Sequence, residues 1–193
     1  MNVEQDKMDF VILAAGDGKR FLSADPSTRH AKQFELLAGR MVLLHSLDTI
    51  SQWPFCGQIV IVLPQDGVEI DISSFKIPHT NNHLVIEGAG GLLVPLNDKD
   101  TILNLIESLN CEVILVSRHY LGSINHTLMS IETLHKRKIP IKGILFNGKE
   151  NKDTESIITK MSSENIIGRI DELDNLNKSI INSVAQNLKN KLI

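Results

Sequence analysis

The sequence predicts an α/β protein with a doubly wound, mostly parallel sheet in a three-layer arrangement. Short apolar runs, too short for helices, alternate along the chain with segments whose apolar residues recur at helical spacing. Strands buried on both faces of a parallel sheet give continuous apolar runs of this kind. Because strands and helices alternate throughout, we expect one parallel sheet with helices on both faces and a single domain over residues 1–193.

Composition places the chain among ordinary globular domains and excludes several classes of function. It has 193 residues, of which 42% are hydrophobic and 22% charged, enough for a sizeable core. The net charge of -3 gives no general attraction to nucleic acid or to anionic membranes. The two cysteines indicate neither a disulfide framework nor a zinc site, and no apolar run approaches the ~18 residues of a membrane span. We therefore expect a cytoplasmic protein that binds neither nucleic acid nor membrane.

The first predicted strand, residues 10–13, runs into a glycine loop that suits an anion. Gly16 and Gly18 supply accessible N–H groups, and Lys19 and Arg20 supply positive charge. The loop is not a Walker A motif, because that motif needs a glycine where Leu13 stands and a Ser or Thr where Arg20 stands. A phosphate-binding loop and a plain surface turn both remain open.

A helix and a second strand follow this loop. Residues 41–51 are predicted to be an amphipathic helix, because apolar residues recur at Leu43, Leu44, Leu47 and Ile50. Residues 58–63 are rich in Ile and Val and are typical of a buried strand. Together with residues 10–13 they complete a βαβ unit.

The apolar run at residues 84–86 delivers an acid, Glu87, to the carboxyl end of a predicted strand. Three glycines follow in four positions, and two of them, Gly90 and Gly91, would let backbone N–H groups approach an anion closely. Open α/β sheets bind their ligands at this end of the strands, and a carboxylate there suits the Mg²⁺ that accompanies a nucleotide. The alternative is a strand that ends in a tight turn with a solvated glutamate.

The remaining half of the chain repeats the alternation of strands and helices. The predicted strands are residues 113–116, 141–146 and 166–168, and the predicted helices centre on residues 102–109, 124–138, 157–161 and 173–188. Gly122 and Asn125 stand at the start of one helix, where N–H groups and the helix dipole suit a carboxylate. A cap in which Asn125 bonds its own backbone explains them equally well. Asn147 ends a strand, either as a base-reading amide or in a plain turn.

Two motifs in order resemble the C-terminal half of dethiobiotin synthase, which closes the ureido ring in biotin synthesis with ATP. The first is Glu87-Gly-Ala-Gly-Gly with Pro95 and Asp98 after it, and the second is Leu121-Gly-Ser-Ile-Asn-His126. The resemblance runs from about Val68 to the C-terminus. It implies a Rossmann-like, P-loop NTPase-like fold, here without a Walker A motif, and a homodimer that uses ATP and Mg²⁺.

The same resemblance implies a role for several residues. Glu87 would bind the metal and act in catalysis, and Gly90 and Gly91 would approach the substrate. Gly122 and Asn125 would hold the carboxylate of diaminopelargonic acid across the homodimer. Asn147 would read the adenine base.

Residues 9–64 are similar to the opening of a different family, the methylerythritol phosphate cytidylyltransferases. The similarity lies in Leu13-Ala-Ala-Gly16-x-Gly18-x-Arg20, then Lys32-Gln-Phe, then Leu43-Leu-His-Ser-Leu47. It implies that the Gly16–Arg20 loop, with Lys19, holds the phosphates of CTP, and that Lys32 offsets charge as pyrophosphate leaves. Ala31 stands where that family has proline, and its later Asp-Ala-Ala-Arg-Pro segment has no counterpart in this sequence.

Three hypotheses follow from a chain that resembles one family over residues 1–66 and another over residues 67–193. The first is a dethiobiotin synthase-like ligase, impaired because the Walker A half is absent. The second is a nucleotidyltransferase of isoprenoid biosynthesis. The third is a non-catalytic chimeric α/β domain. The first requires Glu87 and the Gly16–Gly18 loop to share one nucleotide pocket.

Overall fold

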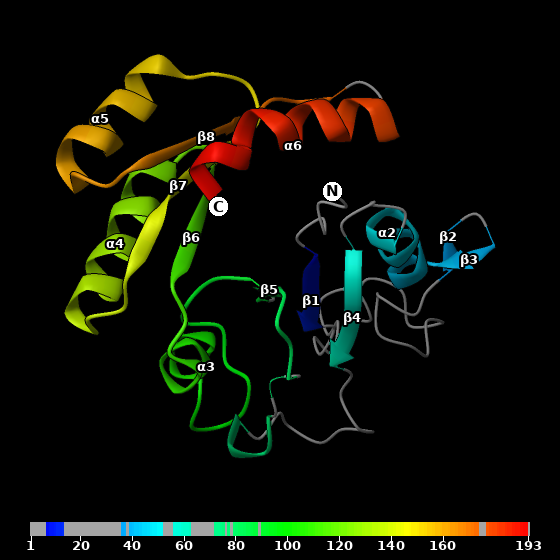
Figure 1. Ribbon diagram of the computed structural model, residues 1–193. Coiled ribbons are helices and arrows are strands. Elements are labelled where there is room, and N and C mark those ends of the chain that lie inside the picture. Colours follow the sequence, from blue (N-terminus) through cyan, green and yellow to red (C-terminus); the bar gives the residue numbers. More distant parts are fainter. Residues whose placement is uncertain are drawn as a thin grey trace. The chain divides into compact units, whose positions relative to one another are not determined.

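The computed structural model divides the chain into two compact units, Met1–Leu105 and Ile106–Ile193 (Figure 1). The described residues are 7–13, 36–37, 39–51, 56–62, 72–75, 77, 79–88, 90–173 and 177–192. Among them, no helix is long and apolar enough to cross a membrane.

The first unit contains a three-stranded parallel sheet in the order β4-β1-β5. The strands are β1 (Met8–Leu13), β4 (Cys56–Val62) and β5 (His83–Glu87). The register places Ile12 opposite Glu87, and Leu13 opposite Val62. The predicted βαβ pairing of the first two strands is confirmed, and so is the strand that ends at Glu87.

The described residues of the first unit also form three helical segments and a small hairpin. The helical segments are α2 (Val42–Ser51), the 3₁₀ turn η2 (Ile72–Ser74) and α3 (Ile102–Leu109), which spans the point where the units divide. The hairpin pairs β2 (Leu36–Leu37) with β3 (Arg40–Met41) and is an addition to the predicted elements. Gly39 lies in its turn at φ +80°, a left-handed conformation that favours glycine.

A buried carboxylate ties the strands of the first sheet together near their amino ends. Asp9, in β1, is only 1% exposed, and its Oδ1 accepts hydrogen bonds from the Gln58 N–H (2.7 Å) and from Asn82 Nδ2 (3.1 Å). A Cβ added to Gly57 would collide with the same Oδ1, so glycine makes room for the carboxylate. Hydrogen bonds from Thr80, the Gln58 N–H and Asn82 hold the pKa of Asp9 below its ordinary value.

We expect Asp9→Asn to destabilise the first unit at neutral pH. The folded-state pKa of Asp9 is depressed, so its stabilisation is complete above the unfolded-state pKa and is lost as the pH falls through the folded-state pKa. Urea midpoints should therefore differ between wild type and variant at pH 7, and the gap should close below about pH 4. Asp48→Asn, which removes only a half-exposed ion pair with Arg40, is the control. A gap that stays constant with pH contradicts this prediction.

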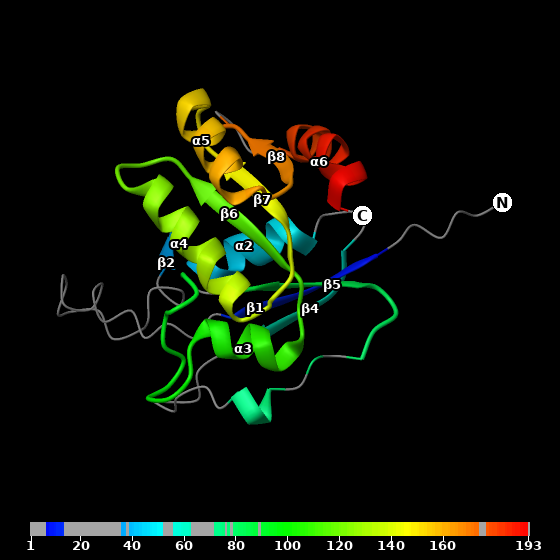
Figure 2. The ribbon, with the colours of Figure 1, turned by 90° about the vertical axis from the view of Figure 1, so that its left-hand side faces the viewer.

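The second unit contains a separate three-stranded parallel sheet in the order β6-β7-β8. Its elements are β6 (Val113–Arg118), α4 (Ser123–Lys136), β7 (Ile141–Asn147), α5 (Lys152–Ser162), β8 (Ile166–Ile170) and α6 (Lys178–Leu192). Figure 2 shows α4 and α5 on one side of this sheet and α6 on the other. The α/β class with parallel strands is thus confirmed, and the described parallel strands form two sheets of three, apart from the two-stranded hairpin of β2 and β3.

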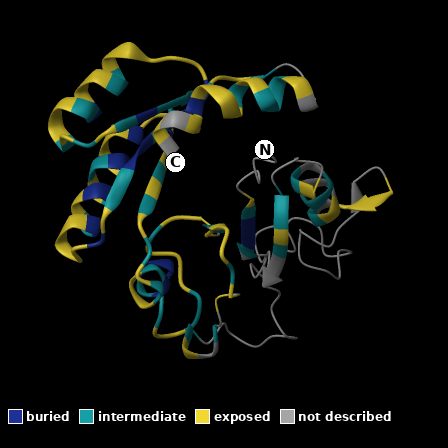
Figure 3. Ribbon diagram, viewed as in Figure 1, coloured by how far each residue is buried: buried dark blue, intermediate teal, exposed yellow. Residues whose placement is uncertain are grey.

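The core of the second unit lies between the sheet and the pair α4 and α5 (Figure 3). Ile131, Ile144, Phe146 and Ile158 are buried together there, with exposures of 3% or less. On the other face, Leu188 of α6 lies over Gly168, where an added Cβ would come within 2.6 Å of the leucine Cδ2. At Gly143 an added Cβ would lie 2.6 Å from the Asn165 carbonyl oxygen, so β7 packs too closely on its neighbour for a side chain.

Candidate functional site

Glu87 ends β5 as an exposed carboxylate. Within the described part of the chain its side chain makes no hydrogen bond or ion pair. Its neighbour in register is Ile12, one residue before the end of β1. The carboxyl end of β1 therefore lies at the same edge of the sheet as Glu87, as expected for parallel strands.

The loop after Glu87 requires glycine at position 90 and leaves free space beside the backbone at position 91. Gly90 has φ +88°, and a Cβ there would lie 2.8 Å from Val94 Cγ2. An added Cβ at Gly91 would meet nothing within 4 Å, so the backbone of Gly91 is accessible to a ligand. Backbone bonds from Ile102 N–H to Val94 O (3.0 Å) and from Leu103 N–H to Leu92 O (2.8 Å) fix the loop against the start of α3.

The predicted phosphate loop lies outside the described residues. This applies to Gly16, Gly18, Lys19, Arg20 and Lys32 alike. The structure describes this part of the chain up to Leu13, the last residue of β1. Leu13 pairs with Val62, and the residue before it, Ile12, pairs with Glu87.

In the second unit, the predicted base-reading residue stands at the carboxyl edge of the sheet. Asn147 ends β7 between Arg118 of β6 and Ile170 of β8 in register. It is exposed, and the described residues offer its amide no hydrogen-bond partner. Gly148 follows at φ +100°, and its N–H bonds to the Ile170 carbonyl (2.8 Å). The amide is therefore free to donate to and accept from a ligand.

The start of α4 lies at the same edge of this sheet. Gly122 precedes the helix at φ +98° and gives it no side-chain cap. Asn125, in the first turn, is exposed, and its predicted alternative, a bond to its own backbone, is absent from the described hydrogen bonds. Tyr120 Oη lies 2.7 Å from His126 Nδ1, which braces the loop that carries Gly122. The Ser123 N–H donates to the Tyr120 carbonyl (3.0 Å), so among the described contacts the N–H groups of Ile124 and Asn125 are left for an anion or for water.

A polar cluster at this edge is an addition to the predicted site. His119 Nε2 lies 2.9 Å from Glu155 Oε1, and Arg169 Nη1 lies 3.4 Å from the same oxygen. All three side chains are at least 79% buried, since their exposures are 12%, 17% and 21%. His119 Nδ1 and Arg169 Nη1 are buried without a hydrogen bond of good geometry among the described residues. Because the three residues are far apart in sequence, only the strand register reveals the cluster.

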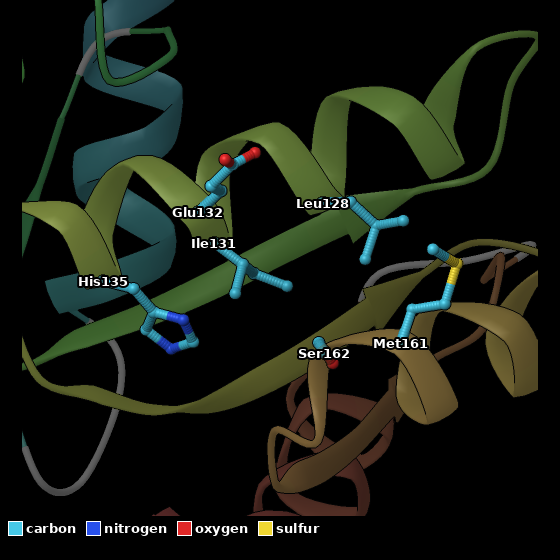
Figure 4. A pocket seen from close by; sticks show the side chains of 6 residues that line it. All are labelled: Leu128, Ile131, Glu132, His135, Met161 and Ser162. Atoms are coloured by element: carbon cyan, nitrogen blue, oxygen red, sulfur yellow. The ribbon is translucent and has the colours of Figure 1, made fainter.

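The described residues contain no group of three or more His, Cys, Asp or Glu side chains that could hold a metal ion by themselves. Burial raises the pKa of the Cys56 and Cys111 thiols, so neither is an activated nucleophile. A hollow of about 300 Å³ lies between α4 and α5, lined partly by Leu128, His135 and Met161, and contains no predicted site residue (Figure 4).

Comparison with known proteins places this arrangement in a family. An ATP-dependent dethiobiotin synthetase BioD of Christiangramia forsetii is 47% identical over 127 residues, covering 66% of this chain and 61% of the relative. The enzymes of the same name from Cytophaga hutchinsonii and Brucella ovis are 45% and 46% identical, covering 64% and 63% of this chain and 60% and 58% of the relatives. The matched part of the chain thus spans about three fifths of the length of these relatives.

These relatives are all dethiobiotin synthetases, so the resemblance of residues 9–64 to a cytidylyltransferase gains no support from them. The family model described as an AAA domain matches residues 58–179. That match begins inside β4 and includes Glu87, the start of α4, Asn147 and the His119 cluster. By this match, the chain belongs to the AAA domain family.

Proposed function

We propose that this chain is an ATP-dependent ligase of the dethiobiotin synthetase type. In that reaction an amine of diaminopelargonic acid captures CO₂ as a carbamate, and ATP phosphorylates the carbamate oxygen. The second amine then attacks the carbamoyl carbon and expels phosphate, which closes the ureido ring. The observation that carries the proposal is the 47% identity to such an enzyme over 127 residues, and the family match over residues 58–179 includes every described candidate residue. A cytoplasmic homodimer is part of the proposal.

Catalysis of this kind rests on positioning and on neutralising charge. Glu87 would bind Mg²⁺, and its exposed carboxylate beside the open Gly91 backbone fits such a role, since Mg²⁺ is commonly held by one or two carboxylates together with substrate phosphates. The metal, when bound, neutralises negative charge on the phosphates. Gly90 and Gly91 would approach the substrate.

The carboxylate of the diamine and the adenine of ATP would both be held at the edge of the second sheet. Gly122 and Asn125 would bind the carboxylate of the diamine through the start of α4, reached across a homodimer. Asn147 would donate to and accept from the adenine edge, and its unpartnered, exposed amide is suited to this.

The triphosphate would fall to Gly16, Gly18, Lys19 and Arg20, with Lys32 as a further cation. This loop lacks the first glycine of the Walker A motif, where Leu13 stands, and its hydroxyl, where Arg20 stands. One preorganised electrostatic contact is commonly worth ~3 kcal/mol, so we propose a turnover reduced by at least about 100-fold relative to the full-length relatives. An assay of the isolated chain with ATP, bicarbonate and the diamine tests this. Turnover equal to that of a full-length relative contradicts the impairment.

Titration with nucleotides tests the proposed function itself. We expect isothermal titration to give binding of ATP that strengthens with Mg²⁺ and exceeds the binding of CTP. A preference for CTP would favour a nucleotidyltransferase, the reading suggested by the loop at residues 13–20. Binding of neither nucleotide would favour a non-catalytic α/β domain.

A further inference from the structure

The connection between β7 and α5 is anchored on both sides. The Gly148 N–H bonds to the Ile170 carbonyl of β8 (2.8 Å), and the Glu150 carboxylate accepts from Arg169 Nη2 (2.8 Å). The Asn151 N–H donates to Glu155 Oε1 of α5 (3.3 Å), while the Asn151 side chain caps that helix by accepting from the Thr154 N–H. Three of the four residues after Asn147 are therefore held by β8 or by α5.

Arg169 is the residue that joins these anchors. Its Nη2 binds Glu150, its Nη1 lies 3.4 Å from Glu155 Oε1, and its Nε lies 3.5 Å from Asp171 Oδ1. The planar guanidinium can meet several carboxylates at once, which a lysine ammonium at the end of a flexible stem does not reproduce. The hydrogen bond with Glu150 lowers the pKa of that carboxyl and raises the pKa of Arg169, so the pair is charged over the working range of pH.

Glu155 also contacts Asn151 and His119. The same Oε1 that accepts the Asn151 N–H faces His119 Nε2 at 2.9 Å, and the His119 ring lies 5.5 Å from the ring of Phe146, the residue before Asn147. Phe146 is also the register partner of Arg169. The strand end that carries Asn147 is thus packed by the His119 ring and tied by the ion pairs of Arg169.

Stability alone gives a weak reason for the Arg169–Glu150 pair. Glu150 is 47% exposed, and ion pairs at that exposure contribute little to the free energy of folding. What the contacts do accomplish is geometric, because they fix the backbone on both sides of an exposed amide that has no partner of its own among the described residues.

We propose that Arg169, through its ion pairs with Glu150 and Glu155, is a positioning residue for Asn147, holding residues 148–151 so that the Asn147 amide presents one orientation to a purine base. This inference rests on the proposed function, since it takes Asn147 to contact adenine. It adds the residues that set discrimination between adenine and guanine, whose six-position groups have opposite hydrogen-bonding character.

The test combines a measurement without ligand and one with nucleotide. In the full chain, Arg169→Gln and Glu150→Gln should speed hydrogen exchange of peptides covering residues 147–151, and Arg169→Lys should give an intermediate rate. The same variants should weaken Mg·ATP binding about tenfold, the scale of one hydrogen bond to a charged group, and bring the Kd values for ATP and GTP closer together. Glu150→Gln changes an exposed side chain, so a folding failure of Arg169→Gln does not remove the test.

Arg137→Gln is the matched control, because it removes an exposed arginine–glutamate pair of the same unit, 2.8 Å to Glu107, and Arg137 lies before the start of β7 whereas Asn147 ends it. It should leave both readouts unchanged. Unchanged exchange in Arg169→Gln and Glu150→Gln overturns the positioning role, and so does faster exchange with an unaltered ATP-to-GTP ratio. A wild-type chain that binds no ATP contradicts the proposed function first, and the claim about Asn147 falls with it.

Discussion

Phe146→Ala is expected to lower the free energy of unfolding of the second unit by about 3–5 kcal/mol. Phe146 is 1% exposed and packs with Ile131, Ile144 and Ile158 between the sheet and the helices α4 and α5. Truncation removes the transfer free energy of the ring and leaves a cavity that the β7 backbone prevents from collapsing fully. Because domains are stable by about 5–15 kcal/mol, this single change removes a large share of the total.

Urea denaturation followed by far-ultraviolet circular dichroism measures the loss. Met161→Ala is the control, since Met161 is 64% exposed and its truncation should change the unfolding free energy by less than about 0.5 kcal/mol. A loss below about 1 kcal/mol for Phe146→Ala would mean that the packing around β7 is much looser than its burial indicates. The variant should also weaken any ligand contact of Asn147, which is the next residue along the strand.

The elements that carry a local signal could be predicted from the sequence. The run that ends at Glu87 is continuous, apolar and followed by glycines, so both the strand β5 and the position of its acid follow from local pattern. The same holds for β7, whose end at Asn147 is marked by the following glycine. In each case the information lies within about ten residues of the site.

Features that depend on pairing between distant segments could not be predicted in this way. The contact between His119 and Glu155 joins residues 36 positions apart, and Arg169 reaches Glu150 only because β8 lies beside β7 in a particular register. Asp9 stands in an apolar run and gives no sign that it will be buried, because its partners Gln58 and Asn82 come from other strands or loops. The hairpin of β2 and β3 has two residues in each strand, too few for a pattern of period two.

Glu87→Gln is expected to abolish the Mg²⁺ dependence of nucleotide binding and to reduce any ligase turnover by about 100-fold or more. The substitution keeps the size of the side chain and removes its negative charge, and neutral amides are weaker ligands than carboxylates for a hard cation. Because Glu87 is exposed and makes no side-chain bond within the described part of the chain, the fold should be unaffected and the unfolding midpoint unchanged.

Titration of ATP with and without Mg²⁺ provides the measurement, so the test does not depend on turnover. Wild type should gain affinity when Mg²⁺ is added, whereas Glu87→Gln should not. Glu112→Gln is the control, since it neutralises another acid, whose carboxylate lies 3.5 Å from Lys142 at the surface, and should retain the wild-type response. An equal gain in both variants would show that Glu87 is not a metal ligand. The role of β5 would then be limited to bringing its glycine loop to the edge of the sheet, beside the end of β1.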